Sequence, residues 1–156
     1  MAKERSEVDS CGHEHVTEEL LERLLASTSI EGYLSAVEPD LEGRDLAEYL
    51  RDLLERKGLG RAQAIAAAGL NATFGYQVFQ GTRHIGRDRA LMLAFGMGCT
   101  LHEAQRLLRL AGHAELWSRR RRDAIVIFCL ERGLSREDCD DELYRMGEET
   151  LLPAEG

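Results

Sequence analysis

Apolar residues along most of the chain recur every three or four positions, which is the spacing of one face of an α-helix. The first such stripe follows Thr17, which can cap a helix that starts at Glu18. Its apolar face would consist of Leu20, Leu21, Leu24 and Leu25. Val, Ile, Thr and aromatic residues are sparse beside Leu, Ala, Arg and Glu, so the sequence predicts an all-α fold.

Residues 44–112 contain five predicted helices, separated by short turns that Gly or Asn residues mark. The first helix ends before Gly58, and its predicted buried stripe is Leu46, Tyr49, Leu50, Leu53 and Leu54. The second covers residues 61–68 before Gly69. The third covers residues 72–80, between a capping Asn71 and Gly81.

The fourth and fifth helices of this region carry their own start and stop signals. The fourth runs from Arg87 to about Phe95 and stops at Gly96 or Gly98. The fifth opens with Thr100 and Glu103, which have the spacing of a capping box, and Gly112 closes it. Its predicted buried stripe is Leu101, Ala104, Leu107, Leu108 and Ala111.

Three segments flank this central region. Residues 1–16 are polar and acidic and are predicted to form a disordered arm, and residues 17–43 are predicted to be a helix followed by a linker over 35–43. Residues 113–152 are predicted to be a helical extension, with one helix over 114–132 and another from Ser135 to about Leu152. The run IVIF at 125–128 fits a buried strand in isolation. Helix is favoured because no second strand is present to pair with it.

The charge of the chain is unevenly distributed. The chain has a net charge of −8, but residues 1–43 hold three basic and eleven acidic side chains, and residues 134–156 hold two and eight. Residues 44–133 hold fifteen basic and nine acidic side chains, a net of +6. A basic central region between acidic ends is compatible with binding to a phosphate backbone, or with an arginine-rich solvated surface.

Other functional classes find little support in the sequence. The longest apolar run, residues 124–130, is far shorter than the roughly 20 residues of a membrane span, and no secretory signal is recognisable, so a cytoplasmic location without membrane contact is expected. The four cysteines form no C-x-x-C pair. Cys11, His13 and His15 have metal-capable side chains but lack a second, distant pair of ligands. We therefore expect no metal, no cofactor and no enzymatic activity.

Residues 61–81 have the organisation of a helix-turn-helix, in which two short helices are joined by Gly69-Leu70-Asn71. Such a turn sets the helices at a steep angle and allows the second one to protrude into a major groove. The side chains predicted to face the core are Ile65, Leu70, Val78 and Phe79. Those predicted to let the two helices approach closely are Ala64, Ala66, Ala67 and Ala68.

The Gly69-Leu70 turn, the "YQVFQGTR" stretch, the R-D-x-x-L-x-L-A helix and "TLHEAQRLLRLAG" together resemble the lambda-repressor-like (Cro/XRE-type) helix-turn-helix regulators. The tail "AELWSRRRRDAIVIFCLERGLS" resembles that of small bacterial regulators of this class with a helical extension. The resemblance implies a five-helix DNA-binding domain over residues 44–112. The chain departs from the family pattern at Ile65, where a small residue is usual, and at Gly75 within the reading helix.

The resemblance also implies which residues would meet double-stranded DNA. The third helix carries no Arg or Lys, so base edges would be read by Asn71, Thr73, Gln77 and Gln80. Contacts to the DNA backbone would come from Arg61, Tyr76, Arg83, His84 and Arg87. The four-arginine run 119–122 is a second candidate for phosphate contact. Alternatively, its members cover a helix surface or pair with the acidic tail, for example with Asp140, Asp141 and Glu142.

The function predicted from these features is sequence-specific DNA binding by a transcriptional regulator that acts as a homodimer. The extension 113–152 is the expected dimer or partner surface, with Ile125, Ile127 and Phe128 at the interface; alternatively, these three residues cap the five-helix core. Trp117 is expected to pack the extension against the helical domain. The alternative is a protein-interaction module that keeps the helix-turn-helix fold but no longer reads DNA. The uncharged reading helix and the acidic ends favour that alternative.

Overall fold

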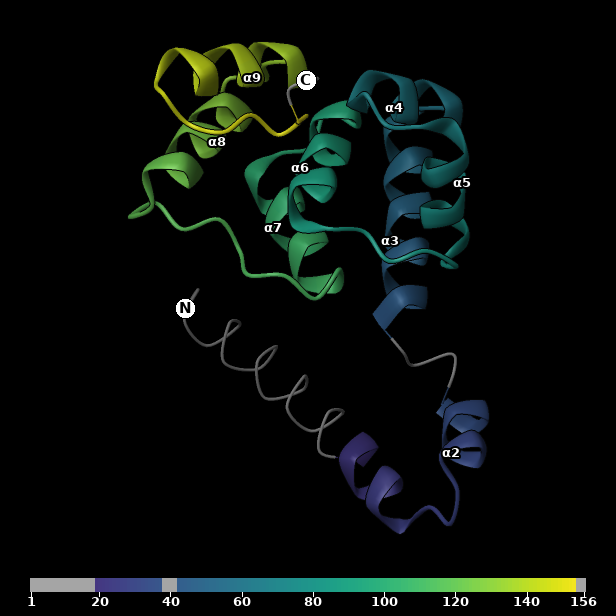
Figure 1. Cartoon of the computed structure of the whole chain (residues 1–156). Coiled ribbons are helices and arrows are strands. Elements are labelled where there is room, and N and C mark those ends of the chain that lie inside the picture. The colour runs from purple at the N-terminus through teal and green to yellow at the C-terminus, as the bar shows by residue number, and fades with distance from the viewer. Residues whose placement is uncertain (1–18, 38–41, 154–156) are drawn as a thin grey trace, which may run out of the picture. The chain divides into compact units, whose positions relative to one another are not determined.

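The computed structural model of the chain describes residues 19–37 and 42–153. It divides into two units, residues 1–41 and residues 42–156, and each is described by itself. Every regular element in the described ranges is a helix, and none of their residues is in a strand (Figure 1). The predicted all-α class is therefore confirmed for this part of the chain.

In the first unit, residues 19–26 are helical and α2 spans Ile30–Val37. Leu21 and Leu25 are 53% and 77% exposed, so the predicted leucine stripe is not buried. Helix α2 was not predicted, and it takes up residues 35–37 of the expected linker. Thr17, the arm 1–16 with Cys11, His13 and His15, and residues 38–41 lie outside the described residues.

The second unit contains seven helices in its described residues. They are α3 (Glu42–Lys57), α4 (Arg61–Ala68), α5 (Ala72–Gln80), α6 (Arg87–Gly96), α7 (Leu101–Leu110), α8 (Arg121–Glu131) and α9 (Arg136–Arg145). Helices α3 to α7 lie where the five helices of residues 44–112 were predicted. Thr100 and Glu103 form the expected capping box, and Gly58, Gly69, Gly81 and Gly112 all have positive φ.

Helices α6 and α7 lie between the α3–α5 group and the α8–α9 pair (Figure 1). Helix α6 is the most deeply buried element, since its residues from Ala90 to Phe95 are all buried. Helix α4 packs closely against it, because a Cβ on Gly96 would lie 2.5 Å from the carbonyl oxygen of Ala64 and 2.8 Å from Cβ of Ala68. Ala64 and Ala68 therefore pack against α6, whereas the four alanines were predicted to approach α5. Ala66 and Ala67 are exposed instead.

The extension differs from the predicted pair of long helices. Residues 125–128 are helical, as favoured, but α8 begins only at Arg121, and residues 113–120 form an irregular loop and turn. Gln105 of α7 holds this loop in a non-helical conformation. Its side chain donates to the carbonyl oxygen of Leu116 (2.9 Å) and accepts from the N–H of Leu116 (2.7 Å). Ser135 caps α9 as predicted.

Helix α9 ends at Arg145 rather than near Leu152, and the chain beyond it folds back over the extension. Gly147, at φ 77°, turns the chain. The N–H groups of Leu151 and Leu152 then donate to the carboxylate of Asp140, at 2.6 and 3.3 Å. Arg136 of α9 pairs with the same carboxylate, and its Nε lies 3.0 Å from the position of a Cβ on Gly69. The extension thus reaches the turn between α4 and α5.

Candidate nucleic-acid interface

The turn between α4 and α5 is fixed by local hydrogen bonds. Gly69 takes the left-handed conformation (φ 80°), which costs glycine no strain. The N–H groups of Gly69 and Leu70 donate to the carbonyls of Ala66 and Ile65, so they satisfy the end of α4. Asn71 then starts α5, because its Oδ1 accepts from the N–H of Phe74 at 3.1 Å.

One face of α5 is packed against the rest of the unit. Gly75, Val78 and Phe79 are buried, and a Cβ on Gly75 would lie 2.6–2.8 Å from three side-chain carbons of Ile65. The Ile65 side chain therefore occupies the space that a side chain at position 75 would need. The two departures from the family pattern compensate for one another, and Gly75 faces the core rather than the outside.

The opposite face of α5 is polar and accessible. Asn71, Thr73 and Gln80 are exposed, and Tyr76 is 36% exposed. Gln77, on the same face, is half-buried. The structure thus places three of the four predicted base-reading residues on one short helix and the fourth, Asn71, at its N-cap. Three of the four are exposed, although Oδ1 of Asn71 is engaged in capping α5.

Arginines surround this helix and stack on its aromatic residues. The guanidinium of Arg61 lies 5.6 Å from the ring centroid of Tyr76, and those of Arg83 and Arg89 lie 5.5 and 4.9 Å from that of Phe74. All three arginines are exposed, and none makes an ion pair with a described residue. Their positive charge is therefore available to an anionic partner.

Arg89 was missed by the sequence analysis. It lies two residues after Arg87 in a helix whose later residues are apolar, and nothing local distinguishes the two. Helical spacing could have shown only that the two side chains lie on different faces of the helix. Arg89 is two positions from Arg87, so the two side chains point away from one another.

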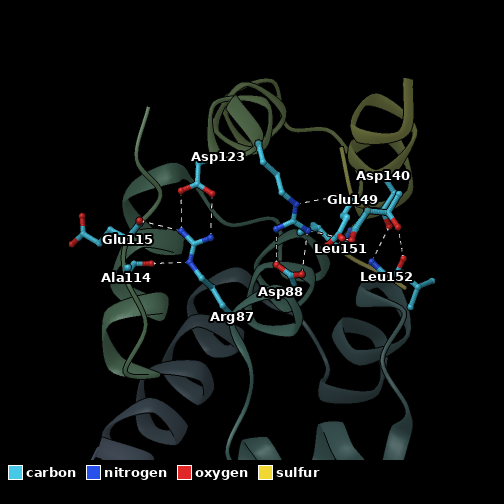
Figure 2. A network of polar contacts seen from close by, with 11 residues as sticks. Arg87, Asp88, Ala114, Glu115, Asp123, Asp140, Glu149, Leu151 and Leu152 are labelled. Carbon is cyan, nitrogen blue, oxygen red and sulfur yellow. Dashed lines mark hydrogen bonds and ion pairs between the residues drawn. The ribbon is translucent and has the colours of Figure 1, made fainter. Parts of the chain in front are cut away.

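Arg87 occupies a different environment from the one predicted for it. Its Nη1 and Nη2 donate to the two carboxylate oxygens of Asp123, at 3.1 and 3.0 Å, and Nε and Nη2 also donate to the carbonyls of Ala114 and Glu115 (Figure 2). These bonds occupy all three guanidinium nitrogens within the chain. We therefore remove Arg87 from the candidate DNA-backbone contacts.

The residue after Arg87 makes the reciprocal contact. Arg122 donates to both carboxylate oxygens of Asp88, at 2.8 and 3.1 Å, and also to the carbonyls of Glu149 and Thr150 (Figure 2). Two neighbours at the start of α6 therefore pair with two neighbours at the start of α8, with the charges exchanged. This double bridge attaches the extension to α6.

The Asp123 carboxylate is the buried centre of the bridge, with only 3% of the residue exposed. Burial by itself would raise its pKa, but the hydrogen bonds from Arg87 and from the N–H of Trp117 outweigh that effect and hold the pKa below its ordinary value. Opposite, the hydrogen bonds to Asp88 raise the pKa of Arg122. Both shifts favour the charged forms of Asp123 and Arg122.

His84 lies beside the start of the extension. Its ring centroid is 5.5 Å from that of His113, whose Nε2 lies 2.7 Å from the carbonyl oxygen of Ile85. A small open cavity of about 210 Å³ separates the segment 81–85 from Leu110 and Ala111. His84 itself is exposed, as its predicted backbone contact requires.

The arginine run 119–122 divides into two halves. Arg121 and Arg122 pair with Glu148 and Asp88, so the acidic partners are not the predicted Asp140, Asp141 and Glu142. Arg119 and Arg120 are exposed and make no ion pair with a described residue. Trp117 is 55% exposed, so the expectation that it packs the extension against the domain is wrong.

The remaining candidates add no chemistry to the described part of the chain. Cys99, Cys129 and Cys139 are buried free thiols. Within residues 19–37 and 42–153, no group of His, Cys, Asp and Glu side chains is arranged to hold a metal ion. In the same ranges, no helix has the length and apolar character to cross a membrane.

Comparison with known proteins gives no match: no protein family, no curated protein and no solved structure is significantly similar to this chain. The resemblance to lambda-repressor-like regulators therefore stays a prediction from the sequence.

Proposed function

We propose that the chain binds double-stranded DNA sequence-specifically through α5 and acts as a transcriptional regulator. The observation that carries the proposal is the two-sided character of α5. One face is locked to α4 by the contact of Gly75 with Ile65, and the other presents uncharged polar side chains. A rigid helix with exposed amide and hydroxyl groups suits base-edge recognition in a major groove.

The charges around α5 support the same proposal. Because α5 has no Lys or Arg, the attraction to phosphates must come from its surroundings, where Arg61, Arg83 and Arg89 have no carboxylate partner among the described residues. Phosphate contacts of this kind provide affinity and register, and the α5 side chains provide sequence preference. In this proposal Arg89 replaces Arg87 among the backbone contacts.

The proposed DNA-binding form is a pair of identical chains, because one short reading helix gives limited affinity and two half-sites double the readout. Helix α8 offers less surface for this pairing than the sequence suggested. Ile125 and Ile127 pack against the core of their own chain, and Phe128 is the residue of the three that stays largely exposed.

A protein-interaction module is the second candidate, and the aromatic residues of α5 favour it. Tyr76 and Arg61 are stacked at the surface, and Tyr and Arg are the residue types that most often dominate protein interfaces. The two candidates differ in their response to salt, since a DNA-binding surface loses affinity steeply as salt rises.

Selection of bound fragments from random DNA, followed by two variants, tests the proposal. Gln77→Ala should cost about 1–3 kcal/mol on the selected duplex and much less on random DNA, because a base contact carries sequence information. Arg83→Ala should weaken binding to both, and should lower the slope of log affinity against log salt by about one.

The contrast between the two variants is the decisive measurement. Both should keep the melting temperature of the parent, which excludes a folding defect as the cause of weaker binding. If Gln77→Ala binds selected and random duplexes as the parent does, α5 is not the reading surface. Absence of salt-dependent binding by the parent to any selected duplex would favour the interaction module.

A further inference from the structure

We propose that the loop 113–120 is a second DNA contact, which holds the duplex backbone beside the site that α5 reads. The inference rests on the proposed function and extends it to a part of the chain outside the five-helix region. The observations behind it are the fixed backbone of this loop, the exposed Trp117, and Arg119 and Arg120, which make no ion pair with a described residue.

The loop is held in place by side chains from three helices. Gln105 of α7 makes two hydrogen bonds with the backbone of Leu116, and Arg87 of α6 donates to the carbonyls of Ala114 and Glu115. The N–H of Trp117 donates to Asp123 at 3.0 Å. Four consecutive residues are therefore fixed before any partner binds, and this lowers the entropic cost of binding.

This rigid backbone presents Trp117 to solvent, with 55% of the residue exposed. Leu116 before it is buried and anchors the loop in the core. More than half of this large aromatic residue is therefore accessible to a partner. It is suited to apolar contact with a flat partner surface, such as the sugar edge of a DNA backbone.

The two arginines that follow complete the proposed contact. Arg119 and Arg120 are exposed and make no ion pair with described residues, whereas Arg121 and Arg122 are paired with Glu148 and Asp88. The nearest acidic side chain in the loop, that of Glu115, is itself paired with Arg109 at 3.0 Å. Asp123 also interacts electrostatically with Arg120, but its carboxylate oxygens are hydrogen-bonded to Arg87, so neither Arg119 nor Arg120 has an ion-pair partner among the described residues.

The loop adjoins the segment that is proposed to touch DNA after α5. The His84 and His113 rings are 5.5 Å apart, and the His113 ring contacts the carbonyl of Ile85. Arg87, the first residue of α6, then bonds directly to the backbone of the loop (Figure 2). The start of the loop therefore lies beside the segment that is proposed to contact DNA after α5, so phosphates outside the recognised bases are the expected ligands.

The test uses the full chain and a selected duplex prepared in two lengths. The short form ends at the bases protected by α5, and the long form adds about one helical turn on each side. On the long form the salt slope of the parent should be steeper by about two per bound chain, one for each arginine. Arg119→Ala/Arg120→Ala should lose this difference and keep parental binding to the short form.

A matched control separates local contact from loss of net charge. Arg132→Ala/Arg145→Ala removes two exposed arginines elsewhere in the extension, from the far end of α8 and the end of α9, and should keep the length-dependent slope. Trp117 is the single tryptophan of the chain, so its fluorescence reports on the loop directly. Its emission should change on adding the long duplex and stay constant with the short one.

Equal slopes on both lengths for the parent would overturn the inference, and so would equal losses in the test and control variants. A tryptophan signal that responds to poly-glutamate through Arg119 and Arg120, and not to the long duplex, would instead assign the loop to an acidic protein. Because the short duplex tests α5 alone, failure of the proposed function would appear as absent salt-dependent binding to both lengths.

Discussion

Arginines only a few residues apart have opposite environments at the surface around α5 and at the α6–α8 junction. Arg83 and Arg89 lie in solvent beside the α5 helix, stacked on Phe74 and without a carboxylate partner among the described residues. Arg87, between them in the sequence, is held by a buried carboxylate and two backbone carbonyls at the α6–α8 junction. The same residue type therefore leaves its charge exposed in one region and holds the fold together in the other.

The cause of the difference is the position of the carboxylates. At the junction, Asp88 and Asp123 face the two arginines that would otherwise carry net charge, and the region becomes locally neutral. Around α5 no such carboxylate is present among the described partners. A positive net charge for residues 44–133 is thus a sum over two regions, of which one is neutralised internally.

The junction should be the region more sensitive to loss of a charge. Asp123→Ala leaves the Arg87 guanidinium and the Trp117 N–H without their acceptor, and should destabilise the fold by about 3 kcal/mol, near the lower end for breaking a buried pair. Urea unfolding of the full chain measures the effect. Asp88→Ala is the matched control, because its carboxylate is 42% exposed, and a loss of about 1 kcal/mol is expected there.

Acid should reveal the same asymmetry. Since the pKa of Asp123 lies below its ordinary value of 3.8, its contribution is complete above that pH and is lost as pH falls through the folded-state pKa. Stability of the parent should therefore fall more steeply below about pH 4 than that of Asp123→Ala. Equal losses for the two aspartate variants, or parallel acid profiles, would show that the junction is not held by this carboxylate.

The packed face of α5 is sensitive for a different reason, which is space rather than charge. Gly75→Ala places a Cβ 2.6–2.8 Å from Ile65, and the strain should cost about 1–2 kcal/mol even though alanine favours helix. Ile65→Ala should cost about 2–4 kcal/mol alone through its cavity. The double variant should be more stable than the sum of the two losses predicts, which a double-mutant cycle of urea unfolding measures. Additive losses would mean that Ile65 and Gly75 do not share one space.

Most of the helical core could be predicted because its signals are local. Gly69, Asn71 and Gly81 define the ends of α4 and α5 through backbone conformation and capping, and both helices begin and end at the predicted residues. Thr100 and Glu103 did the same for α7. The extension was predicted less well, because residues 113–120 leave helix to bond with Gln105 and Arg87, which are distant in sequence.

In the candidate site, too, the residues that depend on local signals could be predicted and those that depend on distant partners could not. Asn71, Thr73 and Gln80 follow from helical spacing once α5 is recognised, and they are exposed as that spacing requires. Trp117 was expected to be packed and is exposed. The pairing of Arg87 could not be predicted, because its partner Asp123 lies in another helix. The role of Ile65 and Gly75 was equally hidden, since the two positions are ten residues apart and only the crossing of α4 and α5 brings them together.

The most direct test of the comparison substitutes Arg87 and Arg89 of α6 separately, and it includes the smallest expected loss of stability. Arg89→Ala should leave the free energy of unfolding within about 0.5 kcal/mol of the parent, because the side chain is exposed and unpaired. It should lower the salt slope of DNA binding by about one. Arg87→Ala should do the reverse. It should lose about 2 kcal/mol in stability, since the Asp123 carboxylate is left buried and without its main partner. Its salt slope on the short form of the duplex should be unchanged in the fraction that remains folded. Urea unfolding and salt titrations of both variants on the selected duplex provide the four numbers. If Arg87→Ala lowered the slope while Arg89→Ala did not, the two arginines would have exchanged roles, and the division between a paired junction and an unpaired DNA-binding surface would be wrong.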